Sequence, residues 1–465
     1  MNEAKLESGR HPYLLRPNRT IFYLSLPILL SLIAEPLTGL IDTGFVARLG
    51  AAPLAALGVG AGALSAVFWV FNFLAIATQT EVAQTFGRGD EEGAKNAVSL
   101  ALLIGIAISL LLSGSLFAGA KVMADALGAQ GAVHDLATEY IRLRVLGAPA
   151  VIVVIVGFGA LRGVQDMKTP LWIALGVNLA NILLDYLFIF GWGAFPALGV
   201  AGAGLASSAS QWLGAIWILR ELGRRIGLSR HVSWRDGFKL LRVGRDLFIR
   251  SASLTIFVLF ATRVATQMGA EAGAAHQVIR QVWFFTALVT EALATTAQSL
   301  VGYFIGSGRR EYARRVAIST TLWSLATGFA MLVLMLAATP IVLAAFVPAA
   351  AAAIFYSAWV IAALSQPLNA LAFITDGIHW GASDYRFLRN AMMMATVCGL
   401  LGLQLIASDQ AESLSGVWLM MALWIAIRAF WGVARLYPGV GDSPFRAGQR
   451  RASTATRQPD RRTIV

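Results

Sequence analysis

Long uncharged stretches constrain this chain more than any other feature, because each is long enough to cross a lipid bilayer. Residues 97–120, 316–340 and 391–408 contain no Asp, Glu, Lys or Arg. A membrane-spanning helix needs about 20 predominantly apolar residues. Apolar residues make up 57% of the chain and charged residues only 13%, whereas a soluble domain carries about 25% charge. The sequence therefore predicts an all-α integral membrane protein.

Twelve candidate spans follow one another along the chain. They lie near residues 21–47, 54–80, 97–120, 141–161, 170–190, 199–219, 246–268, 275–304, 316–339, 354–378, 390–408 and 414–434. We expect twelve transmembrane helices, six in each half of the chain. Because six is even, both halves keep the same orientation, and an axis along the membrane normal relates them.

The two halves are copies of one unit. Four pairs of residues in matching short motifs lie 218 or 219 positions apart: Gly50 and Gly269, Gly87 and Gly306, Pro149 and Pro367, and Gly163 and Gly381. An offset that stays constant to within one residue indicates an internal duplication in the same order. Membrane proteins with two such lobes are often transporters.

The net charge of +12 reflects topology in the membrane and not a nucleic-acid partner. Basic residues concentrate in alternate loops, most densely in 221–245, whereas loops 191–199, 340–353 and 408–413 contain none. Basic loops favour the cytoplasmic side, which places both termini there. The single cysteine, Cys398, lies within a span, so no disulfide framework is expected.

This organisation predicts five parts and a location. The parts are a cytoplasmic N-terminal tail (1–20), an N-lobe (21–220), a cytoplasmic linker (221–245), a C-lobe (246–437) and a disordered, basic cytoplasmic tail (438–465). No cleavable signal pattern precedes the first span. We expect a monomeric, multi-pass protein of a prokaryotic plasma (inner) membrane.

Two carboxylates in the first half stand out, because an ionisable residue at mid-bilayer costs about 2.5–3.5 kcal/mol. Asp42 lies towards the outer end of the first span, Asp185 lies well along the fifth, and Tyr140 opens the fourth. These three residues therefore share a similar depth in the outer half. Asn178 and Asn181 precede Asp185 at helical spacing and share its face. Desolvation and a neighbouring carboxylate both favour the neutral acid, so we expect a coupled proton site.

The duplication strengthens a functional interpretation of this acid pair. The positions equivalent to Asp42 and Asp185 in the second half are Ala261 and either Leu403 or Gln404. If the acids were needed only for folding, both copies would be expected to keep them. A purely structural hydrogen bond is the competing interpretation.

The first span carries three further candidates. Glu35 lies seven residues before Asp42, hence on the same helical face, where it could widen the acidic site or simply be solvated. Pro27 and Pro36 each remove a helical hydrogen bond and bend the helix. A bent first span that bears Asp42 is a candidate moving part, although membrane helices also tolerate static kinks.

The second half carries a smaller set of intramembrane charges. Arg263 is expected to be an internal partner for a carboxylate, and Glu291 and Asp376 are the candidates. Alternatively, these acids could line a cation path in the C-lobe.

Several segments together resemble the multidrug and toxic compound extrusion (MATE) family, most closely its prokaryotic DinF-like branch. They are LSLPILLSLIAEPLTGLIDTGFVARLGAAPLAALG, GALRGVQDMKTP, NLANILLD and DGIHWGASDYRFLRNA, and the resemblance covers residues 15–437. It implies two six-helix bundles that form a V and open alternately to each side. It further implies a cation site in the N-lobe, with the family's aspartates on Asp42 and Asp185, its asparagine on Asn181 and its tyrosine on Tyr140.

The resemblance also implies the activity. It indicates a secondary antiporter, not an enzyme, that exports organic, cationic or amphipathic compounds by alternating access. The exchange would be with H⁺, or alternatively Na⁺, and no cofactor or bound metal is expected. Glu35 departs from the neutral residue expected at its position. The alternative functions are a lipid-linked precursor flippase, a membrane enzyme, which would need a nucleophile and base or a metal cluster, and a receptor or scaffold.

Overall fold

The structure is a computed structural model that describes residues 11–445 apart from residue 194, residues 230–233 and residues 409–412. This described part is built from helices joined by short connections, with one isolated β-bridge between Trp192 and Phe195. The all-α prediction is therefore confirmed. The far ends of both predicted tails, 1–10 and 446–465, lie outside the described residues.

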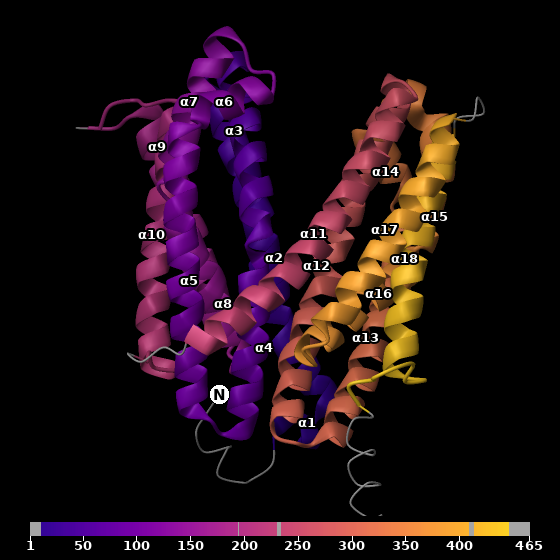
Figure 1. Cartoon of the computed structure of the whole chain (residues 1–465). Helices are drawn as coiled ribbons and strands as arrows, with labels where there is room; N and C mark the ends of the chain where they lie inside the picture. The colour runs from indigo at the N-terminus through magenta and orange to yellow at the C-terminus, as the bar shows by residue number, and fades with distance from the viewer. Residues whose placement is uncertain (1–10, 194, 230–233, 409–412, 446–465) are drawn as a thin grey trace, which may run out of the picture. The chain divides into compact units, whose positions relative to one another are not determined.

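Contacts divide the chain into two compact units, Met1–Ala252 and Ser253–Val465. Figure 1 draws the first from indigo to magenta and the second from orange to yellow. The helices of the first unit are α1 (Pro12–Leu15), α2 (Pro17–Ala47), α3 (Ala51–Val70), α4 (Asn72–Arg88), α5 (Glu91–Ala118), α6 (Ala120–Ala126), α7 (Gly131–Val145), α8 (Ala148–Gly163), α9 (Lys168–Phe190) and α10 (Val200–Arg225).

Helix α11 (Trp234–Gln267) begins in the first unit and ends in the second. The predicted linker, 221–245, corresponds to the end of α10, a connection and the start of α11. The remaining helices are α12 (Ala270–Gly306), α13 (Arg310–Ala337), α14 (Thr339–Phe346), the 3₁₀ turn η2 (Ala349–Ala351), α15 (Ala352–Leu364), α16 (Gln366–Gly381), α17 (Tyr385–Ser408) and α18 (Leu414–Leu436).

Each of the twelve predicted spans is helical. Among the described residues, eight helices are long and apolar enough to cross a membrane, or up to ten if each of two bent pairs is one span. The second and sixth predicted spans do not meet this criterion of length and hydropathy. The second is divided at Phe71, and its inner part, α4, carries polar Gln79, Glu81 and Gln84. The sixth, α10, contains several Gly and Ser residues, which lower its mean hydropathy.

A proline accompanies the break in each bent pair. The axes of α7 and α8 differ by 49°, and those of α15 and α16 by 44°. Pro149 and Pro367 stand at the first or second position of α8 and α16, where a proline fits a helix but interrupts the helix before it. These prolines are one of the repeat pairs, so the two copies break at the same place.

The duplication is also visible in the backbone. Gly50 and Gly269 both have φ of 115°, and Gln165 and Ser383 have φ of 64° and 59°. Positive φ is uncommon for residues with a Cβ. Two such turns at the same offset indicate that both copies adopt the same local structure.

The helices that position the predicted acid site all belong to the first unit. Helix α2 packs along α9, and α7 packs against both α3 and α10. Helix α2 is helical throughout its 31 residues, with Pro27 and Pro36 inside it. An apolar cluster packs between these helices and includes Val46, Tyr140 and Ile189.

Candidate functional site

Asp42 and Asp185 meet between α2 and α9. Their carboxyl groups lie within hydrogen-bonding reach of each other, a bond that requires a proton on one of them. Asp185 is fully buried and Asp42 is partly buried. The Oδ1 atom of each is buried and accepts no hydrogen bond from another protein group. The two acids predicted to share a depth are thus also neighbours.

Asn181 holds the second oxygen of Asp185. Its Nδ2 donates to Asp185 Oδ2 at 3.0 Å, one helical turn along α9, and Asn181 is buried. This contact restrains the carboxyl group of Asp185 and leaves its Oδ1 without a hydrogen bond from the protein. Asn178 is half-buried one turn earlier, and no hydrogen bond joins it to either acid in the described structure.

Tyr140 is held beside the acids by two glycines. Its side chain is 5% exposed and lies within electrostatic range of both carboxyl groups. A Cβ on Gly60 of α3 would collide with the tyrosine ring, and a Cβ on Gly204 of α10 would come within 2.8 Å of the Tyr140 carbonyl oxygen. Small residues on α3 and α10 therefore let α7 approach closely enough to place this tyrosine at the site.

Arg144 is a site residue that the sequence analysis missed. It lies one turn after Tyr140 on α7 and within electrostatic range of Asp42. Its guanidinium carbon stands 5.0 Å from the centre of the Phe68 ring, and its Nη1 is buried with no hydrogen-bond partner. The four-residue spacing from Tyr140 was the signal that could have placed it on this face.

The other candidates on α2 lie differently. Glu35 is exposed, and no described contact joins it to Asp42. Pro27 is buried and Pro36 is half-buried. The structure therefore brings together Asp42, Asp185, Asn181 and Tyr140, and it leaves Glu35 outside that group.

In the second unit, the prediction that Arg263 pairs with Asp376 was wrong. Arg428 of α18 donates from Nη2 to Asp376 Oδ2 at 2.8 Å, and both side chains are buried. Arg263 is exposed on α11, and Glu291 is half-buried on α12. The guanidinium of Arg428 also stacks over Trp424 at 4.5 Å. The position of Arg428 inside the last predicted span, 414–434, was the signal in the sequence that could have identified it.

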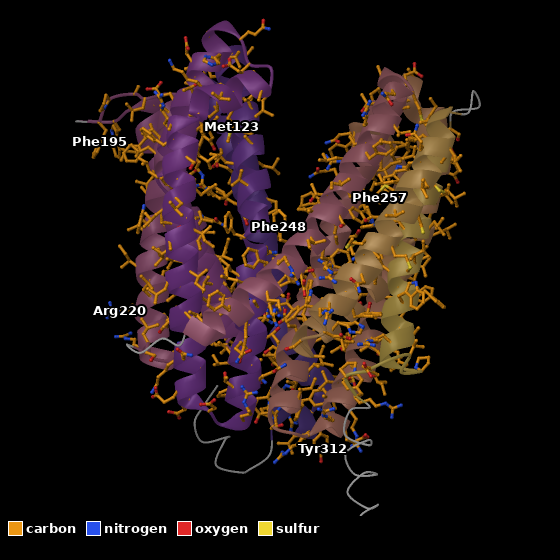
Figure 2. The ribbon with its side chains drawn as sticks, viewed as in Figure 1. Met123, Phe195, Arg220, Phe248, Phe257 and Tyr312 are labelled. Carbon is orange, nitrogen blue, oxygen red and sulfur yellow. The ribbon has the colours of Figure 1, made fainter. Side chains whose placement is uncertain are left out.

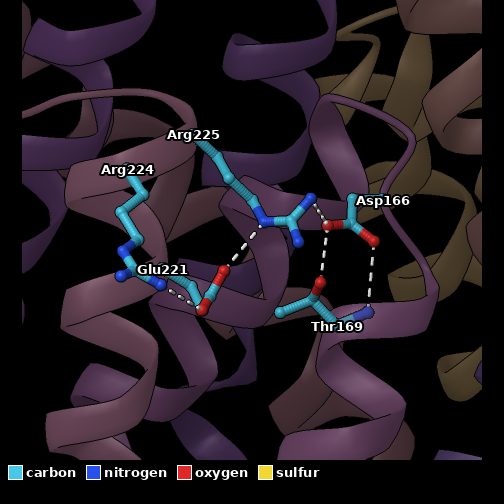
Figure 3. Close-up of polar contacts among 5 residues, drawn as sticks. All are labelled: Asp166, Thr169, Glu221, Arg224 and Arg225. Carbon is cyan, nitrogen blue, oxygen red and sulfur yellow. Dashed lines mark hydrogen bonds and ion pairs between the residues drawn. The ribbon is translucent and has the colours of Figure 1, made fainter. Parts of the chain in front are cut away.

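The same kind of ion pair joins an aspartate to a long helix in each unit. In the first unit, Arg225 Nη1 lies 2.8 Å from Asp166 Oδ2, while Thr169 donates to the same aspartate through its backbone N–H and its hydroxyl (Figure 3). Figure 3 also shows Glu221 beside Arg225 and Arg224. These contacts fasten the turn after α8 to the end of α10.

The second unit repeats this arrangement with a histidine added. Asp384 accepts from Arg435 Nε and Nη2 at 2.9 and 3.1 Å, and His379 Nδ1 lies 3.3 Å from Asp384 Oδ2. Burial alone would raise the pKa of Asp384, but the contacts with His379 and Arg435 outweigh it and hold this pKa below its usual value. Asp166 and Asp384 are 218 residues apart, so both copies use the same clamp.

Comparison with known proteins supports this architecture. The family model MatE matches residues 27–187 and 247–406, one match in each half. Protein DETOXIFICATION 44, chloroplastic, of Arabidopsis thaliana is 31% identical over 430 residues, which cover 90% of this chain and 81% of that protein. DNA damage-inducible protein F of Escherichia coli (strain K12) is 25% identical over 438 residues, which cover 90% of both.

Solved structures agree with the fold. A crystal structure of MATE in the bent conformation superposes with a TM-score of 0.83 at 21% identity, covering 95% of this chain and 96% of the other. The fold and the matched segments define a multi-pass membrane transporter, not an enzyme. The chain belongs to the MatE family, whose members are secondary transporters for the efflux of drugs and toxic compounds.

Proposed function

We propose that this transporter exports organic cations in exchange for H⁺ and that Asp42 and Asp185 bind the coupling proton together. The observation that carries the proposal is the pair of buried carboxyl groups, each with an oxygen that accepts no other hydrogen bond. Two ionised carboxylates at this distance repel each other. One proton between them removes a negative charge and provides the hydrogen bond that both oxygens lack, so the pair titrates as a unit.

The surroundings favour a proton over Na⁺. A hard metal cation needs several oxygen ligands at once, but Asp185 Oδ2 already accepts from Asn181. In the second unit, Asp376 has a guanidinium partner in Arg428, which argues against a cation site at that carboxylate.

Proton binding would change what the first unit attracts. In the ionised state the pair carries negative charge and favours a cationic substrate. Protonation removes that attraction, so the substrate leaves on the side from which the proton came. A membrane potential drives the proton inward with about 2.3 kcal/mol per charge per 100 mV. Release of the proton to the cytoplasm restores the charge for the next substrate.

Helix α2 is the element suited to respond. It carries Asp42 and also Pro27 and Pro36, so a change in its contact with α9 can be absorbed where helical hydrogen bonds are missing. The related solved structure in the bent conformation shows that a protein of this fold adopts a bent state. We expect the lobes 21–220 and 246–437 to alternate in exposing the site to each side.

Transport in proteoliposomes tests this assignment directly. We expect a pH gradient alone to drive the efflux of a cationic dye and a Na⁺ gradient alone to drive none. Asp185→Asn, which keeps the shape of the side chain, should abolish pH-driven efflux. Glu35→Gln is the matched control, because it neutralises another carboxylate near Asp42 in sequence but outside the site. Efflux that persists in both Asp42→Asn and Asp185→Asn, or that follows Na⁺, would refute the proposal.

A further inference from the structure

An apolar groove lies between the end of α2, the second half of α9 and the loop after α9. It has a cavity volume of about 410 Å³, within the range of sites for small organic ligands. Its lining is almost wholly apolar and consists of Phe45, Ile182, Leu183, Tyr186, Leu187 and Trp192. All six belong to the first unit. Such a groove in a membrane protein is suited to a hydrocarbon chain.

The groove continues an apolar stripe along α9. Large side chains exposed at spacings of three or four residues run along one face of this helix: Trp172, Leu175, Leu179, Leu183 and Tyr186. Residues at this spacing form one surface of a helix. Lipid is the medium that such a surface meets in a multi-pass membrane protein. The groove is the place where this surface becomes concave.

A cation stands at the groove. The guanidinium of Arg48, at the end of α2, lies 5.9 Å from the ring centre of Phe45, which forms one wall. Arg48 is exposed, and no described carboxylate forms an ion pair with it. Arginine matches the geometry of a phosphate group and binds it with charge-assisted hydrogen bonds.

Aromatic side chains mark the same end of the helices as the membrane interface. Trp192 and Phe195, in the loop after α9, are 74% and 51% exposed, and Tyr186 is 53% exposed. Figure 2 shows Phe195 projecting from the end of the first unit. Trp and Tyr gather at the level of lipid headgroups. An acyl chain in the groove would therefore place its headgroup near Arg48.

We propose that this groove binds a phospholipid, with one acyl chain between Phe45 and Leu183 and the phosphate against Arg48. Along both helices, the lining of the groove lies next to the acid pair. Phe45 follows Asp42 by three residues, Ile182 precedes Asp185 by three, and Tyr186 is the next residue after Asp185. A lipid seated here contacts both helices that carry the acids, at the same level, so it stabilises one spacing between α2 and α9. The binding site itself does not depend on the proposed proton coupling.

Native mass spectrometry of the purified full-length protein, titrated with dioleoyl phosphatidylglycerol, tests the site. Leu183→Trp fills the groove, and Leu179→Trp is its matched control, since Leu179 is 60% exposed one turn away and does not line the groove. Arg48→Gln removes the phosphate ligand. Arg19→Gln is its control, because Arg19 also stacks on an α2 aromatic, Tyr23 at 5.2 Å, at the opposite end of the helix.

We expect the wild-type protein to retain one phospholipid at a low ratio of lipid to protein. Leu183→Trp and Arg48→Gln should each lower this occupancy about tenfold, the effect of losing one charge-assisted interaction or the room for the chain. Both control variants should retain the lipid. Dioleoylglycerol, which lacks the phosphate, should bind as weakly to the wild type as phosphatidylglycerol binds to Arg48→Gln.

Two results would overturn the proposal. Equal lipid retention in Leu183→Trp and Leu179→Trp would mean that the bound lipid is not in the groove. Equal binding of dioleoylglycerol and phosphatidylglycerol would mean that Arg48 does not recognise a phosphate. Neither result bears on the Asp42–Asp185 pair, because lipid retention is measured without transport.

Discussion

At the scale of single residues, each charged side chain of the candidate site lies close to a polar, charged or aromatic neighbour. Asp185 has Asn181 and Asp42, and Arg144 stands near Asp42 with an aromatic face beneath it. A guanidinium beside the pair lowers the electrostatic cost of ionising both carboxyl groups. If the pair carries the coupling proton as we propose, Arg144 assists the release of that proton.

Arg144→Gln should therefore shift the pH dependence of transport. Without the guanidinium, the pair holds its proton more tightly, so proton release becomes slower and the optimum for efflux moves to higher pH. The measurement is the initial rate of dye efflux from proteoliposomes at a series of pH values on both sides of neutrality.

Arg142→Gln serves as the control for that shift. Arg142 lies on the same helix and also stacks on an aromatic ring, Phe117 at 5.6 Å, but it makes no described contact with the acids. An identical pH profile for Arg144→Gln and the wild type would show that Arg144 does not influence the pair.

At the scale of elements, two ion pairs join α18 to α16 and to the turn after α16. Asp376 of α16 binds Arg428, and Asp384 in the turn binds Arg435, seven residues further along α18. Between them, Gly432 approaches Thr375 so closely that a Cβ would collide with the threonine hydroxyl. Close backbone approach and buried charge pairs together fix the register of these two helices.

Breaking the Asp376–Arg428 pair should strongly destabilise the second unit. Arg428→Met removes the guanidinium that neutralises buried Asp376, which costs about 3–5 kcal/mol. The double variant Asp376→Leu/Arg428→Met should recover most of this loss, because an apolar pair needs no compensation. Thermal and denaturant unfolding of the detergent-solubilised protein measures both. Arg263→Met, at an exposed arginine, should change stability by less than about 0.5 kcal/mol; equal losses in all three would rule out a role for the pair.

The Asp384–Arg435 pair predicts that the stability of the protein depends on pH. The pKa of Asp384 is lowered in the folded protein from 3.8, its usual value. A lowered pKa means that the carboxylate contributes stability above the unfolded pKa and loses it as pH falls through the folded pKa. The midpoint of unfolding should therefore fall more steeply below about pH 4 in the wild type than in Asp384→Asn. Parallel curves for the two proteins would contradict this expectation.

At the scale of the whole molecule, two copies keep the same framework and differ in their charged sites. Both break a helix at a repeated proline and clamp an aspartate to their last long helix. Only the first copy carries the acid pair, while the second places an aspartate–arginine pair in its interior. The duplication therefore provides two bundles, of which we infer that one couples transport to protons.

The orientation of the whole chain in the membrane is a prediction at this scale. The basic loops predict that both termini face the cytoplasm. Epitope tags fused before Met1 and after Val465 should become accessible to antibody only after cells are permeabilised. A tag that is labelled in intact cells would overturn the assigned topology, and with it the direction of proton movement proposed above.

Much of the fold could be predicted from the sequence, because long apolar stretches and a fixed offset are local and periodic signals. The acid site was predictable in part. Asp42 and Asp185 stood out by the cost of burying charge in lipid, and Asn181 by its helical spacing from Asp185. Arg144 and Arg428 did not, since their roles depend on which residue of another helix they face. Arg263 was expected to pair with Glu291 or Asp376 because all three lie within predicted spans, and the structure pairs Asp376 with Arg428 instead.

The sequence by itself determined that this protein lies in a membrane, is helical and is built from two like halves, because hydrophobic length and internal repetition need no knowledge of contacts. Only the tertiary structure decided which charges meet. Helices α2 and α9 are separated by more than a hundred residues, and their packing alone brings Asp42 to Asp185 and forms an apolar groove beside them. Partner choice across such a distance depends on helix rotation and close approach, neither of which the spacing of residues along one helix can specify.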